Sequence, residues 1–244
     1  SGLTMPVAIE EIFWGDAGIG MAIMGSGLAA AGISGNGTPE QMIEWVPQCY
    51  GTPEDIKLGA FCVSEPDAGS DVSSLRTSAV YDEAKDEWVI NGHKWFISGA
   101  RGAQFALLVA RTEEDPDLPQ AANSCFIVDI PSEGWNVVRD IETMSGGHNH
   151  CEILIEDLRV PASSMLGGRG QGHLLGQYRL GPARLAHCMR WIGQAETALD
   201  MMVARSLERY SHGSLLAEKQ GIQWLIADSA MEIYQCKLMI LHAA

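Results

Sequence analysis

The sequence predicts a multi-domain α+β protein in which an antiparallel β-sandwich or barrel lies between two α-helical parts. Three observations lead to this prediction. Apolar residues recur at helical spacing near both ends, β-branched and aromatic runs fill the middle, and turn residues separate those runs. We expect the three parts to cover residues 1–58, 59–165 and 166–244. The 244 residues suffice for a hydrophobic core in one large or two smaller domains.

Residues 5–31 open the first helical part, because they are rich in Ala, Met, Ile and Gly and carry few charges. They predict two buried helices with a break near Gly15. Residues 38–45 predict a short helix, since Thr38 suits the N-cap and Pro39 suits the first helical position.

The middle part is predicted to hold about seven short strands, at residues 77–81, 87–90, 94–98, 105–111, 124–130, 135–140 and 152–160. Turn residues separate them at 82–86, 91–92, 115–119, 131–134 and 145–149. Because no helical segment lies between the strands, we expect antiparallel pairing in a sandwich or barrel.

A glycine-rich hinge at residues 167–172 precedes the last helical part. One helix face is marked by Leu185, Met189, Ile192, Ala195, Leu199, Val203, Leu207 and Tyr210, and Pro182 either opens this helix or kinks an earlier turn. After a break at residues 211–213, a second face is marked by Ile222, Leu225, Ala230, Ile233, Cys236 and Ile240. We expect the two helices to pack antiparallel.

The charge of the chain excludes two classes of partner. With 16 basic and 31 acidic residues the formal net charge is −15, so we expect no binding to nucleic acid or to an anionic membrane surface. Only residues 166–244 are locally positive, with 8 basic and 6 acidic side chains. No window approaches the uninterrupted apolar length of a membrane span, so none is expected.

Three further patterns have simple interpretations. The six cysteines are scattered without the spacing of a zinc or redox motif, which indicates reduced thiols in an intracellular compartment. Residues 25–30 fit a Gly-x-Gly-x-x-Ala fingerprint, but no strand precedes them, so we assign them to helix packing. Residues 148–151 contain two histidines and a cysteine, but no second ligand cluster accompanies them, so no metal site is predicted.

Two segments of the middle part carry candidate binding chemistry. In residues 62–71, the hydroxyls of Ser64 and Ser70 and the backbone amides around Gly69 suit a phosphate or diphosphate, and a plain surface loop is an equal alternative. In residues 91–99, a hairpin turn feeds a strand on which Phe96 and Ser98 share one face. An apolar ring beside a hydroxyl suits a heterocyclic cofactor. The same arrangement equally suits the ordinary edge of a hydrophobic core, which is the commoner case.

Together these two segments resemble the acyl-CoA dehydrogenase family of flavoproteins. The resemblance includes residues 158–161 and 208–213 and runs in order from about residue 5 to residue 244. Residues 179–190 are similar in particular to the branch that comprises family members ten and eleven. The resemblance implies FAD, bound where a β-domain meets the helical parts at a subunit interface, in a homodimer or homotetramer.

The resemblance also implies roles for single residues. Residues 61–70 would contact the flavin and its diphosphate, with Phe61, Val63, Ser64, Gly69 and Ser70 at the cofactor, and Ser70 shared with the acyl-CoA substrate. Phe96 and Ser98 would flank the flavin ring, and many relatives carry Trp where Phe96 stands. The FAD of a neighbouring subunit would be reached by Arg209, Ser211, Lys219 and Gln220. Gly181 and Arg184 would line the acyl-CoA channel. From the residues alone, Arg209 fits a helix-end salt bridge and Arg184 a solvated face.

The activity that the resemblance implies is α,β-desaturation of an acyl-CoA. A glutamate removes the α-proton while the β-hydrogen leaves as hydride to flavin N5, and electrons pass to an electron-transfer flavoprotein. Some relatives place that base at the position of Ala183, which cannot act as one, and most place it beyond residue 244. We therefore predict no catalytic base in this chain and expect an internal fragment, truncated at both ends. The compartment is open between bacterial cytoplasm, mitochondrial matrix and peroxisome.

Two alternatives remain. An acyl-CoA oxidase-type flavoprotein would use the same scaffold with oxygen as acceptor. A catalytically silent FAD- and acyl-CoA-binding protein would also fit the missing base.

Overall fold

The computed structural model describes residues 2–25, 27–113, 122–144, 146–147 and 149–244. The chain divides into two compact units. We call Gly25–Arg179 the sheet unit, and Ser1–Met24 with Leu180–Ala244 the helical unit. The three-part division expected from the sequence stays a prediction.

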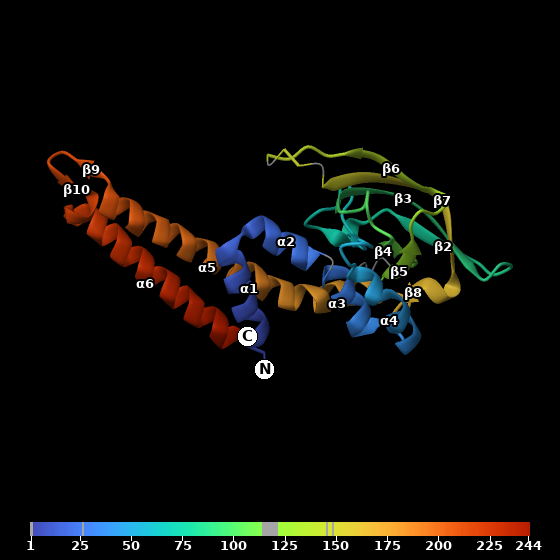
Figure 1. The fold of residues 1–244 in the computed structure, drawn as a ribbon. Helices are drawn as coiled ribbons and strands as arrows, with labels where there is room; N and C mark the ends of the chain where they lie inside the picture. Colours follow the sequence, from blue (N-terminus) through green and yellow to red (C-terminus); the bar gives the residue numbers. More distant parts are fainter. Residues whose placement is uncertain (1, 26, 114–121, 145, 148) are drawn as a thin grey trace. The chain divides into compact units, whose positions relative to one another are not determined.

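The sheet unit is built on an eight-stranded sheet with the order β6-β7-β3-β2-β4-β5-β8, while β1 pairs with β4 off this path (Figure 1). Its strands are β1 (Gly59–Cys62), β2 (Ser78–Asp82), β3 (Glu87–Ser98), β4 (Phe105–Arg111), β5 (Asn123–Asp129), β6 (Trp135–Asp140), β7 (His150–Pro161) and β8 (Met165–Leu166). The α+β class predicted from the sequence is therefore confirmed.

The sheet is mixed, so the prediction of purely antiparallel pairing was wrong. β1 runs parallel to β4, and Ser78 of β2 pairs in parallel with Arg111 of β4. Parallel neighbours need a long connection between them. The loop after β1 and the β2–β3 hairpin together supply that connection without a crossover helix. Because no helical segment separates the strands, the sequence did not indicate a parallel pair.

The predicted hairpin turn at Asn91-Gly92 is also wrong, because β3 runs unbroken from Glu87 to Ser98 and the pairing with β7 shifts between Ile90 and Gly92. A Cβ at Gly92 would lie 2.2 Å from Thr77 Oγ1. Glycine therefore serves a close approach inside a bulged strand, which a turn signal in the sequence does not distinguish from a hairpin.

Two apolar clusters form the core of the sheet unit. One lies within the sheet and includes Trp88, Phe126 and Ile153. The other packs β4 and β5 against α3 (Gly27–Asn36), through Ile33, and against the start of α5, through Leu175. The short helix α4 (Pro39–Trp45) begins as predicted, with the Thr38 hydroxyl accepting from the Gln41 amide.

The helical unit contains α1 (Thr4–Gly15), most of α2 (Ala17–Gly25), α5 (Gly172–Glu208) from Leu180 onward, and α6 (Gln220–Ala243). Residues 5–31 therefore hold parts of three helices where two were predicted, although the break near Gly15 is confirmed. Pro182 lies inside α5, which begins ten residues earlier, at Gly172.

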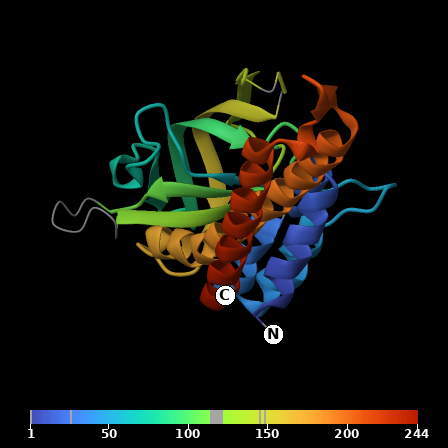
Figure 2. The same ribbon diagram turned by 90° about the vertical axis from the view of Figure 1, so that its left-hand side faces the viewer.

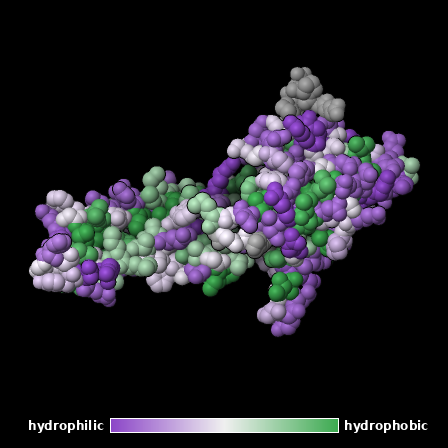
Figure 3. All heavy atoms as spheres, turned by 90° about the horizontal axis from the view of Figure 1, so that it is seen from above, coloured by the Kyte–Doolittle hydropathy of each residue, from purple (hydrophilic) through white to green (hydrophobic). Residues whose placement is uncertain are grey.

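α5 and α6 lie side by side and are joined by the small hairpin of β9 (Tyr210–Ser211) and β10 (Ser214–Leu215) (Figure 1 and Figure 2). The antiparallel pairing predicted for them is confirmed. Of the predicted α6 face, Leu225, Ala230 and Cys236 are exposed, because only one side of α6 is covered within the unit. Apolar side chains consequently remain on the surface of this helix pair (Figure 3).

Residues Ala17–Asn36 form one segment that is long and apolar enough to cross a membrane, by length and composition only. This corrects the expectation that no window approaches such a span. Core helices of soluble proteins pass the same test. Within this segment, Ala29, Ala30 and Ile33 of α3 are buried in the core of the sheet unit.

Candidate functional site

The loop after β1 is joined directly to β3 by two hydrogen bonds, one between main-chain groups and one from a side chain. The Trp95 amide donates to Ser64 O at 2.9 Å, and Ser64 Oγ donates to Trp95 O at 2.7 Å. The structure therefore places Ser64 beside the residue that precedes Phe96, and so brings together two segments that the sequence analysis had linked only by resemblance. The Ser64 hydroxyl hydrogen is used in this contact, which leaves its oxygen available as an acceptor.

A buried ion pair lies beneath this loop. Lys94 Nζ donates to Val63 O and to Glu65 Oε1, both at 2.9 Å, and the Lys94 side chain is fully buried. The Glu65 carboxylate also accepts from the Arg76 amide at 2.7 Å, from the Thr77 amide at 3.0 Å and from Thr77 Oγ1 at 2.5 Å. Sequence reasoning missed both charged residues, although both stand inside the motifs it singled out.

The surroundings of the pair shift the pKa of each partner. Burial raises the pKa of Glu65, but Lys94, the Thr77 hydroxyl and the Arg76 amide outweigh it, so the pKa lies below its ordinary value. Burial also lowers the pKa of Lys94, and the Glu65 carboxylate opposes that shift. Four donors on one carboxylate indicate that Glu65 is ionised in the folded chain.

A bulge in β3 exposes the aromatic side chain of Phe96. Its φ is +58°, and the pairing of β3 with β7 shifts between Lys94 and Ile97. Strict alternation would place Lys94 and Phe96 on the same face, but the bulge leaves Lys94 buried and the Phe96 side chain half exposed. Ser98 is exposed as well, and its Oγ lies 2.8 Å from His150 Nδ1.

The tip of the loop carries free hydrogen-bond donors. Glu65 and Ala68 close a tight turn through two main-chain hydrogen bonds of 3.0 and 3.1 Å. Beyond it, the main-chain amides of Gly69 and Ser70 have no acceptor among the described residues, and a Cβ at Gly69 would meet no atom within 4 Å. Unpaired amides in open space suit a phosphate or diphosphate group, and this role for Gly69 and Ser70 stays a prediction.

Phe61 in β1 has a cationic neighbour that the sequence analysis did not foresee. The Arg179 guanidinium lies over the Phe61 ring, 4.7 Å from its centroid. Its Nε is buried without a hydrogen-bond partner in the described part of the chain, and burial lowers the pKa of Arg179. No local signal marked this contact, since it joins a strand to a helix more than a hundred residues later.

The remaining predicted cofactor residues belong to the helical unit. They lie between the end of α5 and the start of α6 and comprise Arg209, Ser211, Lys219 and Gln220. Ser211 pairs with Ser214 across the small hairpin, and Lys219 Nζ donates to Ser214 Oγ at 3.1 Å. Arg209 is exposed, and no ion pair holds its side chain among the described residues, so the helix-end salt bridge considered for it is not formed.

The predicted substrate residues Gly181 and Arg184 are exposed on α5. Between them lies Ala183, the position that the resemblance assigned to the catalytic base of some relatives, and this assignment stays a prediction. The side chain at this position therefore offers no group that takes up a proton.

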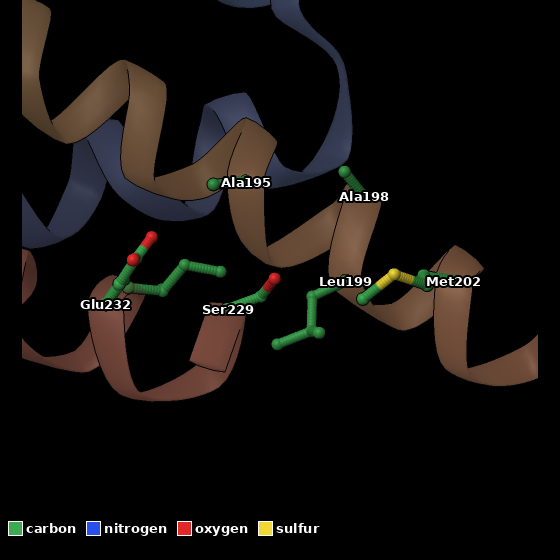
Figure 4. A pocket seen from close by; sticks show the side chains of 7 residues that line it. Ala195, Ala198, Leu199, Met202, Ser229 and Glu232 are labelled. Atoms are coloured by element: carbon green, nitrogen blue, oxygen red, sulfur yellow. The ribbon is translucent and has the colours of Figure 1, made fainter. Parts of the chain in front are cut away.

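One cavity of about 330 Å³ lies between α5 and α6 (Figure 4). It is lined by Ala195, Ala198, Leu199, Met202, Ser229, Glu232 and Ile233. Figure 4 shows Leu199 of α5 and Ser229 of α6 directed toward one another. No predicted site residue lines this space, which is mainly apolar, so we attribute it to the packing of the helix pair.

The described residues contain no group of three His, Cys, Asp or Glu side chains that could hold a metal ion. Of the histidine pair weighed as a ligand cluster, His148 lies outside the described residues, and His150 contacts Ser98.

Comparison with known proteins identifies the family. Residues 60–158 match the acyl-CoA dehydrogenase middle domain, and residues 170–244 match the acyl-CoA dehydrogenase C-terminal domain. The chain thus belongs to the acyl-CoA dehydrogenase family, as the sequence motifs indicated.

Individual relatives support the same assignment. The chain is 38% identical to the probable acyl-CoA dehydrogenase FadE2 of Mycobacterium tuberculosis, over 85% of this chain and 51% of that protein. It is also 38% identical to acyl-CoA dehydrogenase family member 10 of Mus musculus, over 85% of this chain and 20% of that protein. The structure of butyryl-CoA dehydrogenase from Megasphaera elsdenii superimposes with a TM-score of 0.88 at 29% identity, over 100% of this chain and 63% of that one. The chain spans about half the length of FadE2.

Proposed function

We propose that this chain supplies the FAD-binding and acyl-CoA-binding part of an FAD-dependent acyl-CoA dehydrogenase. The observation that carries the proposal is the loop of residues 63–70, which is fixed to β3 beside the exposed ring of Phe96 and presents unpaired amides at Gly69 and Ser70. Bound FAD would supply hydride acceptance at the flavin ring. The residues of this chain would bind and orient the cofactor and the thioester.

In this proposal the cofactor residues act in two groups. Phe61, Val63, Ser64, Phe96 and Ser98 of the sheet unit face the flavin ring, while the amides of Gly69 and Ser70 hold the diphosphate. Arg209, Ser211, Lys219 and Gln220 of the helical unit reach the FAD of a second copy, where the guanidinium of Arg209 offers a fork that matches a diphosphate. Ser70, Gly181 and Arg184 contact the acyl-CoA.

The second copy is a subunit of a homodimer or homotetramer. Support comes from the exposed apolar side chains on α5 and α6, among them Trp191, Trp224, Tyr234 and Met239, since such residues favour an interface. We place the protein inside the cell, in bacterial cytoplasm, mitochondrial matrix or peroxisome. Its cysteines are free, and burial raises the pKa of the Cys49 thiol to about 11, as suits a reduced structural thiol.

The natural electron acceptor in this proposal is an electron-transfer flavoprotein. The acyl-CoA oxidase alternative differs only in its acceptor, so it is separated by measuring oxygen consumption and peroxide with the reduced flavin. Rapid, stoichiometric peroxide formation would favour the oxidase.

The first experiment tests FAD binding by titration of the purified chain, read by the visible absorbance of the flavin. We expect saturable binding that weakens in Phe96→Ala, because that variant removes the exposed ring beside the loop. Val80→Ala, which trims another exposed apolar side chain of the same sheet, serves as the matched control and should bind FAD like the unmodified chain. A chain that folds and takes up no FAD contradicts the proposal.

A second experiment mixes the FAD-loaded chain anaerobically with acyl-CoA thioesters of several chain lengths. We expect perturbation of the flavin spectrum with little bleaching, because Ala183 offers no base for the α-proton. Rapid bleaching would contradict the absence of a base. A chain that binds FAD while no thioester perturbs its spectrum would contradict the proposed binding of acyl-CoA.

A further inference from the structure

We propose that the buried Lys94–Glu65 ion pair is a positioning pair, which holds the loop of residues 63–77 in the conformation that receives FAD. The inference rests on the proposed function and concerns how this chain prepares the site before the cofactor arrives. Neither residue need touch FAD, since both act through the main chain that they hold.

The pair closes both ends of the loop. Lys94 fixes the first end by donating to Val63 O, and Glu65 fixes the second by accepting from the Arg76 and Thr77 amides. The residues proposed to meet the diphosphate, Gly69 and Ser70, lie between these two points in the sequence. Closing a loop at its ends removes conformational freedom that a ligand would otherwise have to remove on binding.

The same pair also connects the loop to the residue that faces the ring. Lys94 stands two positions before Phe96, and the amide between them, that of Trp95, donates to Ser64 O. The φ of +58° at Phe96 is unfavourable for an aromatic residue, so it persists only where its surroundings hold it. The anchored Lys94 on one side of the bulge provides such a constraint.

A lysine in the core is costly unless it is paired, and a buried ion pair that is replaced as a whole by apolar residues often leaves the fold equally stable. An apolar residue at position 94 alone would leave Val63 O without its donor and the Glu65 carboxylate without its counter-charge. The pair therefore specifies one loop conformation, which an apolar contact of the same volume would not select.

Hydrogen exchange on the unmodified chain tests the coupling without any substitution. If the pair links its bonded amides to the site, then FAD binding must stabilise them in turn, because coupling between sites is reciprocal. We expect added FAD to slow exchange at the amides of Arg76, Thr77 and Trp95 at least fivefold, although none of the three is a proposed FAD contact. Exchange rates at these amides that FAD leaves unchanged would overturn the inference.

Variants test the same point by affinity. Lys94→Met should weaken FAD binding at least tenfold, and Lys94→Met/Glu65→Gln, which removes both charges and keeps an acceptor oxygen for Thr77, should weaken it similarly. Arg159→Met is the matched control, because it removes a positive charge that pairs with Asp82 and Glu87 at the surface of the same sheet. Its affinity for FAD should stay within twofold of that of the unmodified chain. A folded Lys94→Met that binds FAD within twofold of the unmodified chain overturns the inference. If neither Lys94 variant folds, the exchange experiment decides.

The two proposals fail in distinguishable ways. Absence of FAD binding by the unmodified chain contradicts the proposed function itself. Tight FAD binding without any response at the three amides contradicts only the positioning role of the pair.

Discussion

Each unit of the molecule buries a glutamate against a lysine, and the two pairs are built differently. In the sheet unit, Glu65 accepts four hydrogen bonds and Lys94 is inaccessible to solvent. In the helical unit, Glu10 is 1% exposed, while the Lys237 that it meets retains a third of its side-chain exposure. Both side chains of the first pair are buried, whereas in the second pair only the glutamate is buried and the lysine is partly exposed.

The charge balance differs as well. Lys237 is shared, because its Nζ also lies 3.3 Å from Glu196, so two carboxylates depend on one ammonium. These three side chains come from α1, α5 and α6, and the cluster therefore ties together three helices. The Glu10 hydrogen bond raises the pKa of Lys237, and burial together with Glu10 raises the pKa of Glu196. The contacts of the sheet-unit pair fix both ends of a loop, whereas those of the helical-unit cluster join three helices.

The largest effect is expected for Lys94→Met. Lys94 is the one counter-ion that pairs with Glu65 among the described residues, so its removal leaves Glu65 buried and charged. Breaking a buried pair in this way costs about 3–5 kcal/mol of unfolding free energy. Urea unfolding measures the difference. A loss below about 1 kcal/mol would mean that the pair is solvated in the folded chain, and the contrast between the two units would then disappear.

Lys237→Met should cost less, about 1–3 kcal/mol, because the lysine is already partly hydrated while Glu10 is not. Lys57→Met serves as the control, since Lys57 is about as exposed as Lys237 but pairs with the exposed carboxylate of Asp55. This variant should change the unfolding free energy by less than about 1 kcal/mol. If Lys237→Met proves as damaging as Lys94→Met, partial exposure is not what distinguishes the two pairs.

Gly193→Ala tests how closely α1 approaches α5 around that cluster. A Cβ at Gly193 would lie 2.3 Å from Glu10 O and 2.8 Å from Trp14 N, so the backbone of α1 would have to move. We expect a loss of about 1–3 kcal/mol in thermal or urea unfolding. Gly176→Ala, on the same helix and with no atom within 4 Å of its Cβ, should instead be neutral or stabilise by about 1 kcal/mol. Equal results for the two variants would show that α1 is free to shift.

The sequence predicted elements better than it predicted their connections. Helical periodicity located α5 and α6, and the Thr38-Pro39 pair located the start of α4, because those signals are local. The parallel pairing of β1 with β4 and the continuity of β3 through Gly92 depend on residues distant in the sequence, and turn chemistry alone gave the wrong answer there.

In the candidate site, too, local motifs were predicted from the sequence and long-range contacts were not. Ser64 and Phe96 were named through the family motifs, and the structure places their segments side by side. Lys94 and Glu65 were passed over, because a charged residue is normally assigned to the surface. Only the tertiary contacts reveal that these two charges are buried against each other.

The smallest expected effect is a difference in acid response between the two units. The pKa of Glu65 is lowered in the folded state, so its contribution to stability is complete above its ordinary value of 4.5 and is lost as the pH falls through the folded value. The pKa of Glu196 is raised, so the folded chain binds that proton more tightly than the unfolded chain, and its contribution grows as the pH falls through a value above 4.5. Urea unfolding from pH 7 down to pH 3 should therefore show that the unmodified chain loses stability relative to Glu65→Gln below about pH 4.5. Over a higher range it should gain stability relative to Glu196→Gln. Slopes of the same sign for the two variants would contradict the proposed difference, because both carboxylates would then be acting as ordinary partners of a lysine.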